Sequence, residues 1–169
     1  MKKFLKAMVL VLAFTLVFSL AGCSSKKAIT ADKFENIMKD ENYDVSDGSG
    51  DDIDPDYDIN EVRYAYEQDD YYPAAVFIEF GSTKDAKDCY ANAVDDSKSS
   101  IDDNNLDVTT TSKSSGDYQK YSVKGEDEYG DNTYTVMIRV KDTVLTVYTD
   151  GDSKSDVKNV DGIVTKLGY

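Results

Sequence analysis

Alternating carboxylates are the first feature of this 169-residue chain that could perform chemistry. The alternating set is Asp52, Asp54, Asp56 and Asp58. Oxygen ligands spaced in this way within a loop can converge on Ca²⁺. The match to an EF-hand is poor, because Tyr57 stands where that loop needs glycine and Arg63 where it needs glutamate. We therefore expect a solvated acidic loop over 47–61 without a metal, and keep a weak calcium site at the four aspartates as the alternative.

Other catalytic groups are scarce. The sequence contains no histidine, which removes the commonest general base and excludes Ser-His-Asp and Cys-His nucleophile arrangements. Of its two cysteines, Cys89 lies on the apolar face of an expected helix, so we expect it to be a buried core residue. A two-carboxylate hydrolase is the remaining enzymatic alternative, although no tryptophan is present to stack a sugar. We expect no catalytic residues and no cofactor.

Tyrosine is unusually frequent, with 13 residues against six phenylalanines. A tyrosine side chain has an apolar body and a polar tip, which suits both the edge of a core and a recognition surface. Most of the tyrosines fall within expected strands and helices, where a position at the edge of the core is favoured. Tyr71 and Tyr72 instead precede Pro73 in an expected hairpin loop, so they are the candidate contact patch.

The elements that must position these residues follow from the apolar spacing. Helices are predicted from 31 to 40, from 82 to 95 and from about 153 to 168. Predicted strands and loops alternate between them: strands at 62–67, 74–80, 118–124, 134–140 and 143–149, and loops at 46–60 and 96–117, the latter with a weak edge strand at 106–111 as an option. This order predicts an α+β fold, with an antiparallel sheet of about five to six strands and about three helices packed mainly on one face.

The beginning of the chain has the three parts of a secretion signal. Three lysines precede an apolar run from Met8 to Leu20, and Ala21, Gly22 and Cys23 follow. The apolar run is shorter than the ~20 residues needed to span a bilayer. The sequence Leu20-Ala21-Gly22-Cys23 resembles the lipobox of bacterial prolipoproteins. That resemblance implies lipidation of Cys23, cleavage before it, and attachment of the mature chain to a membrane.

The resulting division of the chain is a removed signal at 1–22, a lipidated cysteine with a short tether at 23–29, and one acidic domain at 30–169. The formal charge is −14, and removal of the three lysines in residues 1–22 changes it to −17. So acidic a surface excludes nucleic acid, whose binding depends on Lys and Arg. We expect a non-enzymatic interaction or binding module on the outer face of the bacterial cytoplasmic membrane, with an envelope protein as its partner. A ligand-binding lipoprotein, for Ca²⁺ or a small solute, is the alternative.

Overall fold

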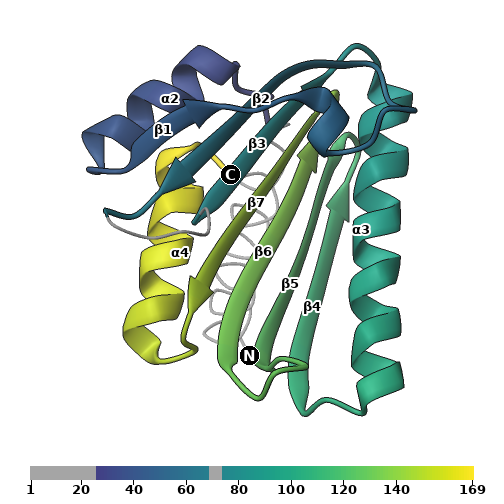
Figure 1. The fold of residues 1–169 in the computed structure, drawn as a ribbon, viewed down its shortest axis with the longest axis vertical. Coiled ribbons are helices and arrows are strands. Elements are labelled where there is room, and N and C mark those ends of the chain that lie inside the picture. Colours follow the sequence, from purple (N-terminus) through teal and green to yellow (C-terminus); the bar gives the residue numbers. More distant parts are fainter. Residues whose placement is uncertain (1–25, 69–73) are drawn as a thin grey trace, which may run out of the picture.

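The computed structural model describes residues 26–68 and 74–169 (Figure 1). The helices in this part of the chain are α2 (Ala31–Asp40), α3 (Thr83–Asn104), α4 (Lys154–Lys166) and the short 3-10 helix η1 (Gly50–Asp52). The strands are β1 (Asp44–Asp47), β2 (Ile59–Tyr66), β3 (Ala75–Phe80), β4 (Val108–Ser115), β5 (Tyr118–Glu126), β6 (Asn132–Val140) and β7 (Thr143–Asp150).

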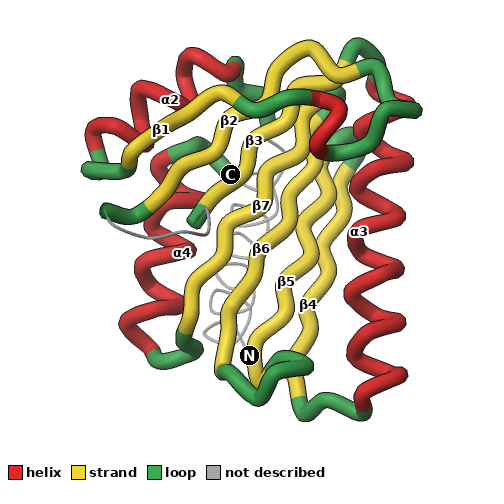
Figure 2. The backbone as a smooth tube through the Cα atoms, in the orientation of Figure 1, coloured by secondary structure: helices red, strands yellow, loops and turns green. Residues whose placement is uncertain are grey.

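All seven strands form one sheet in the order β1-β2-β3-β7-β6-β5-β4, and every neighbouring pair is antiparallel (Figure 2). The predicted α+β class with an antiparallel sheet is therefore confirmed. The predicted count of five to six strands is too low. The uncounted strand is β1, a four-residue segment that lies partly within the stretch predicted to be a loop.

Local side-chain chemistry sets where each helix begins. The hydroxyl of Thr30 accepts a hydrogen bond from the backbone of Lys33 at the start of α2, and Ser82 does the same for α3. At α4, Ser153 and Asp156 form a complete capping box. These caps satisfy N–H groups that have no partner inside the helix, so each helix begins where the sequence places a capping residue.

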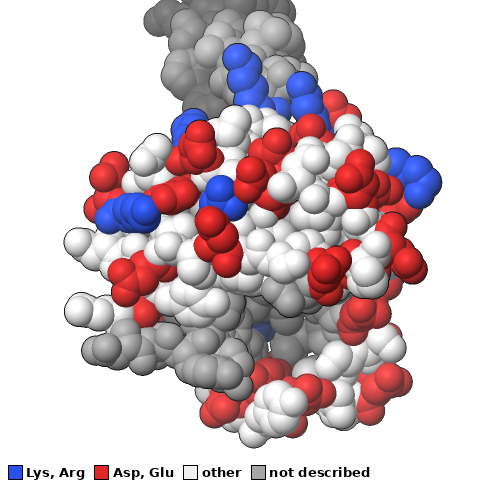
Figure 3. Space-filling view, turned by 45° about the horizontal axis from the view of Figure 1, so that its top comes forward, with Lys and Arg blue, Asp and Glu red and all other residues white. Residues whose placement is uncertain are grey.

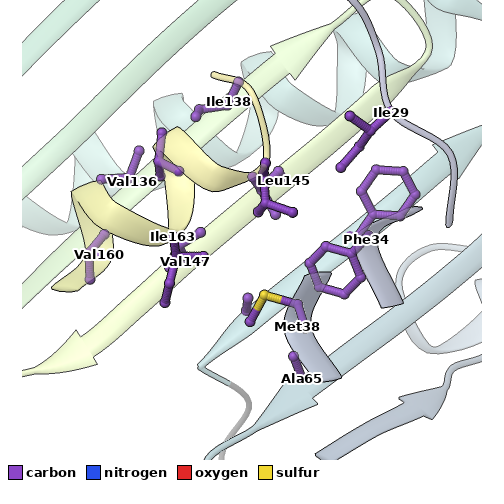
Figure 4. Close-up of a cluster of buried hydrophobic side chains, with 14 of the residues drawn as sticks. Ile29, Phe34, Met38, Ala65, Val136, Ile138, Leu145, Val147, Val160 and Ile163 are labelled. Carbon is purple, nitrogen blue, oxygen red and sulfur yellow. The ribbon is translucent and has the colours of Figure 1, made fainter. Parts of the chain in front are cut away.

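Helices cover both faces of the sheet. Helices α2 and α4 share one face, where Phe34, Met38 and Leu145 are among the side chains that are almost fully buried (Figure 4). Helix α3 lies on the opposite face, over a second apolar cluster that includes Tyr90 and Tyr121. Successive strand residues point to opposite faces, so the two cores draw on alternate positions of the same strands. Two of the three long helices thus share one face, and the third covers the other.

The segment 96–117 differs most from its prediction. We expected mostly loop there, but α3 continues to Asn104 and β4 occupies 108–115. The Asp- and Ser-rich composition favours turns locally, yet no glycine or proline interrupts the helix before Asn105, which ends it in a left-handed conformation. The prediction of a loop was therefore wrong, and the optional edge strand at 106–111 overlaps β4 only at 108–111.

The folded domain begins before residue 30, its predicted first residue. Ile29 is buried in the first core, and its backbone N–H donates to the Tyr169 hydroxyl at 3.2 Å. Lys26 Nζ donates to the carbonyl of Gly168 at 3.3 Å. The expected tether 23–29 therefore contributes its last residues to the folded unit, next to the C-terminus.

Candidate functional site

The chain contains only two arginines, and their environments differ sharply. Arg63 on β2 lies among three carboxylates: Glu61 Oε2 is 2.7 Å from its Nη1, while Asp47 Oδ1 and Glu35 Oε2 are 3.3 and 3.6 Å from its Nε. Burial alone would lower the pKa of Arg63, but the acidic neighbours, Glu61 first, raise it above its usual value. Arg63 is thus a neutralised link between α2, β1 and β2, although its buried Nε has charge contacts and no hydrogen-bond partner among the described residues.

Arg139 on β6 is more deeply buried, with 5% of its surface exposed, and has neutral partners. Its Nε donates to Gln119 Oε1 at 2.6 Å, and its Nη1 donates to the carbonyl of Lys141 at 2.9 Å. Among the described residues, no carboxylate oxygen lies within 4.0 Å of its guanidinium. Two hydrogen bonds use only part of the five N–H groups of an arginine side chain. A buried cation without an opposite charge is energetically unfavourable, so this arrangement requires an explanation.

Two tyrosines lie close to Arg139 on the α3 face. Tyr121 on β5 is paired with Met137, two residues before Arg139 on the neighbouring strand, which makes Tyr121 a diagonal neighbour. Its hydroxyl is sealed from solvent and has no hydrogen-bond partner within the described residues. Tyr90 approaches from α3; burial raises the pKa of its hydroxyl to about 12, while the nearby Arg139 guanidinium opposes that rise. We call Tyr90, Gln119, Tyr121 and Arg139 the Arg139 cluster.

The flank of α3 nearest this cluster carries basic side chains. Asn92 donates to the Tyr57 hydroxyl at 2.8 Å, which turns one flank of α3 toward the loop before β2. On a helix of 3.6 residues per turn, Lys87 and Lys98 then lie on the other flank, toward β5. Both lysine side chains are exposed. Lys98 Nζ lies 3.2 Å from Asp95 Oδ1, so an acidic neighbour on the same helix balances its charge.

A second feature of this side of the molecule is the free edge of β4. All eight residues of β4 pair with β5 in an unbroken register from Val108↔Gly125 to Ser115↔Tyr118. Every β4 residue except Val108 is exposed. Beyond β4 no further strand pairs with the sheet in the part of the chain that the structure describes. The strand therefore presents a row of backbone groups that can bond to another extended chain.

The turn geometry identifies which β4 backbone groups face outward. Gly116 and Asp117 form a two-residue hairpin turn with a positive φ of 59° at Gly116, typical of type II′. In such a hairpin the residues flanking the turn exchange hydrogen bonds, and bonded and non-bonded pairs then alternate along the strands. Thr110 and Ser112 are non-bonded positions by this count, so their N–H and C=O groups point away from the sheet. By the same count, the N–H and C=O groups of Thr111 point inward to β5. Its side-chain hydroxyl lies 2.7 Å from that of Ser122.

The opposite edge of the sheet is protected. Strand β1 has four residues, two of which are aspartates, and α2 packs beside it. Short length, charge and cover by a helix are the features by which proteins keep an edge strand from pairing with other chains. Strand β4 has none of them except the single charge of Lys113.

The residues proposed from the sequence fall outside these features. Cys23, Tyr71 and Tyr72 lie outside the described residues, as does the side chain of Asp52. Asp54 Oδ1 accepts a hydrogen bond from the backbone of Asp56 at 2.9 Å, a local loop contact. Asp58 lies against Gly81 at the other end of this loop. Within 26–68 and 74–169, no three His, Cys, Asp or Glu side chains are arranged to hold a metal ion.

Cys89 packs against the second core but is only partly buried. Burial first, and then the charge of Asp54, raises the pKa of its thiol above the usual value. A raised pKa keeps the thiol protonated at neutral pH, which makes it a poor nucleophile.

Sequence reasoning missed both the Arg139 cluster and the β4 edge. One available signal was that the chain has only two arginines, one of them, Arg139, within a strand of otherwise apolar and uncharged residues. The other was the run of Thr and Ser at 109–115, a composition compatible with an exposed strand but read as loop.

Comparison with known proteins adds little. No protein-family model matches the chain, and a search of curated proteins found no match. Among solved structures, a GTP binding regulator from Thermotoga maritima is similar, with a TM-score of 0.43 and 12% sequence identity over 82% of this chain and 84% of that one. This likeness is too weak to indicate a function.

Proposed function

We propose that this chain is a bacterial lipoprotein, anchored through Cys23 on the outer face of the cytoplasmic membrane, whose domain is a non-enzymatic interaction module. The observation that carries the interaction role is the free edge of β4: eight regularly paired, exposed residues without the protection seen at β1. The partner supplies an extended segment that adds to the sheet as a further strand. Backbone hydrogen bonds provide affinity in this mode of recognition, and alternate side chains provide specificity.

The anchor is supported by the signal and lipobox at the start of the sequence and is compatible with the fold. Lys26 lies against the C-terminal residues, and the three residues from Cys23 to Lys26 can span at most ~11 Å. Anchoring at Cys23 would therefore hold the C-terminal end of α4 close to the bilayer. Helix α4 rises ~20 Å over its 13 residues, so with its axis perpendicular to the bilayer the turn between β7 and α4 would lie that much further from the membrane. No helix among the described residues is long and apolar enough to cross a membrane.

The charge of the surface favours a partner from another protein over a second copy of this chain. Acidic side chains dominate the face shown in Figure 3, and the whole sequence carries −14. Two copies joined along β4 would bring two such charges together, and that repulsion is weakened only by salt. Lys113 is the single charge on β4 itself. An extended segment with neutral or basic residues meets no such repulsion.

The calcium alternative gains no support from the geometry of the loop between β1 and β2, and we do not carry it further. The small-solute alternative is favoured by one observation, the Arg139 cluster.

Two proline variants test the interaction role. Each removes one backbone N–H of β4, which faces away from the sheet in one variant and toward β5 in the other. Thr110→Pro removes an outward N–H and should block strand addition while leaving the β4–β5 pairing intact. Thr111→Pro removes an inward N–H and should destabilise the hairpin itself. A photoreactive residue at Ser112 in the full chain, expressed in intact cells, should form one discrete protein adduct that Thr110→Pro abolishes.

The same photoreactive residue at Asp44 on β1 is the matched control and should give no adduct. An adduct at Ser112 that survives Thr110→Pro, or equal labelling from both edges, would refute strand addition at β4. The anchor is tested separately: Cys23→Ala should release the protein from membranes, and continued lipid labelling of that variant would refute the anchor.

A further inference from the structure

The two arginines differ in whether neighbouring carboxylates balance their charge. The chain has 33 acidic and 19 basic residues, so carboxylates are abundant. Arg63, on the partly exposed side of β2, has three of them within 4.0 Å. Arg139 is more deeply buried and, among the described residues, has none. An unpaired charge becomes less favourable as it is removed from water, so the more buried arginine has the greater need for an anion.

A second, independent observation points to the same place. The hydroxyl of Tyr121 belongs to a side chain with 2% of its surface exposed and has no partner within the described chain. Buried hydroxyl groups nearly always form a hydrogen bond, and a missing partner often marks a ligand or water that is not represented. On the sheet, Tyr121 is the diagonal neighbour of Arg139 on the face covered by α3. An anion accepting from both groups would satisfy both at once.

The surrounding groups suit an anion. Gln119 holds the Arg139 Nε at 2.6 Å, and the carbonyl of Lys141 holds Nη1 at 2.9 Å, so the guanidinium is fixed in orientation. A guanidinium fixed in this way presents a planar set of donors that matches the geometry of carboxylate and phosphate oxygens. Ser112 and Ser114 on β4 place further hydroxyls on the same face of the sheet, opposite Tyr121 and Gln119.

Access requires a movement of α3. The Tyr121 hydroxyl is sealed, so an anion reaches it only when the turn of α3 that carries Tyr90 lifts from the sheet. Helix α3 is held unevenly: Ala86, Tyr90 and Val94 are buried, and the half after Val94 has no buried residue. Regions with few buried apolar contacts open at low free energy, so opening begins in the second half of α3. Opening that extends to Tyr90 also breaks the apolar contacts of Val94 and Tyr90.

We propose that the Arg139 cluster is a binding site for a compact oxyanion of the phosphate or carboxylate type, held by the Arg139 guanidinium and the Tyr121 hydroxyl and covered by Tyr90 of α3. The site adjoins β4 through Ser112 and Ser114, but the proposal rests neither on strand addition nor on the membrane anchor. Its ligand can be a free anion or an anionic group of a larger molecule.

The two-arginine composition supplies a clean assay. In the ¹⁵N-labelled full chain in detergent micelles, Arg63 and Arg139 give the only two arginine Nε–H signals. Inorganic phosphate, sulfate, acetate and chloride are titrated separately at constant ionic strength. The Arg139 signal should shift saturably with phosphate or with acetate, and the Arg63 signal should stay in place. Saturation by phosphate and sulfate alone identifies a phosphate-type site, and saturation by acetate a carboxylate-type site.

Two variants make the assay decisive. Tyr121→Phe removes one hydrogen bond to a charged ligand and should weaken binding about tenfold. Gln119→Glu supplies a carboxylate to Arg139 from within the chain and should abolish binding while the domain stays folded. An Arg139 signal that does not move, that follows Arg63 without saturating, or that shifts equally with chloride would overturn the proposal. Unchanged affinity in Tyr121→Phe would also overturn it.

Discussion

Arg63 and Arg139 show two ways of placing a cation in an acidic protein. Arg63 keeps 13% of its side chain exposed and gathers carboxylates from α2, β1 and β2. Arg139 lies beneath α3 and is held by an amide and a backbone carbonyl. The first arrangement fastens the short edge strand to the rest of the domain. The second fixes the orientation of a cation that has no carboxylate oxygen within 4.0 Å among the described residues. The difference separates a structural residue from a candidate binding residue on the same sheet.

The comparison is tested most strongly by replacing each arginine with methionine. Arg63→Met leaves three neighbouring carboxylates without their shared counter-charge and should lower the free energy of unfolding by about 2 kcal/mol. Arg139→Met removes a buried, unpaired charge and retains the apolar volume, so its effect should stay within about 1 kcal/mol in anion-free buffer. Urea unfolding, with an unchanged dependence on denaturant, measures both. The reverse order of effects would contradict the assignment of roles.

Two buried tyrosines offer a similar comparison, between a hydroxyl without a partner and a hydroxyl with one, and the expected effects on stability are smaller. Tyr121→Phe removes a buried hydroxyl that has no partner in the described chain, so it should raise the free energy of unfolding by about 1 kcal/mol in anion-free buffer. Tyr134→Phe is the matched control, because the Tyr134 hydroxyl donates to Asp161 Oδ1 at 3.3 Å. That variant should lower the free energy of unfolding by about 1 kcal/mol. Equal effects of the two changes would mean that Tyr121 has a partner after all.

Acid should weaken the Arg63 region and spare the Arg139 region. Lys39 first, and Arg63 to a lesser degree, lower the pKa of Glu35 from its usual value near 4.5. A carboxyl group whose folded pKa is lowered contributes stability that is present above its unfolded pKa and is lost as the pH falls through the folded pKa. Unfolding free energies measured from pH 6 to pH 3 should therefore decline less steeply in Glu35→Gln than in the wild type. Arg139→Met should keep the wild-type slope.

Alkali should instead weaken the region around Arg139, and this loss of stability should be the smallest of the predicted effects. Burial raises the pKa of Tyr90 to about 12, and Arg139 opposes that rise. Above pH 10 the unfolded chain loses this proton while the folded chain keeps it, so stability falls as the pH increases toward 12. Tyr90→Phe should make this decline shallower, and Arg139→Met should raise the pKa of Tyr90 further. A titration of tyrosine absorbance measures the Tyr90 pKa in Arg139→Met. An unchanged pKa would mean that the charge of Arg139 does not act on Tyr90.

Much of the fold could be predicted because local patterns determine it. The β6–β7 hairpin shows strict alternation from Tyr134 to Val140, and both strands occur where expected. The start of α3 follows from Ser82, whose cap is visible in the sequence as well as in the structure. The second half of α3 and the full length of β4 could not be predicted. Their Asp, Ser and Thr residues have weak local preferences, and the continuing helix and the pairing with β5 decide their conformation.

The sequence by itself determined the acidic character of the chain, the absence of histidine, the α+β class and the resemblance of residues 20–23 to a lipobox. These depend on composition and on short-range spacing. Only the tertiary structure decided that one arginine meets three carboxylates and the other none, and that β4 is a free edge while β1 is covered. Both facts depend on which strands become neighbours, and residues far apart in the chain, such as Glu35 and Arg63 or Tyr90 and Arg139, meet only after the sheet has formed.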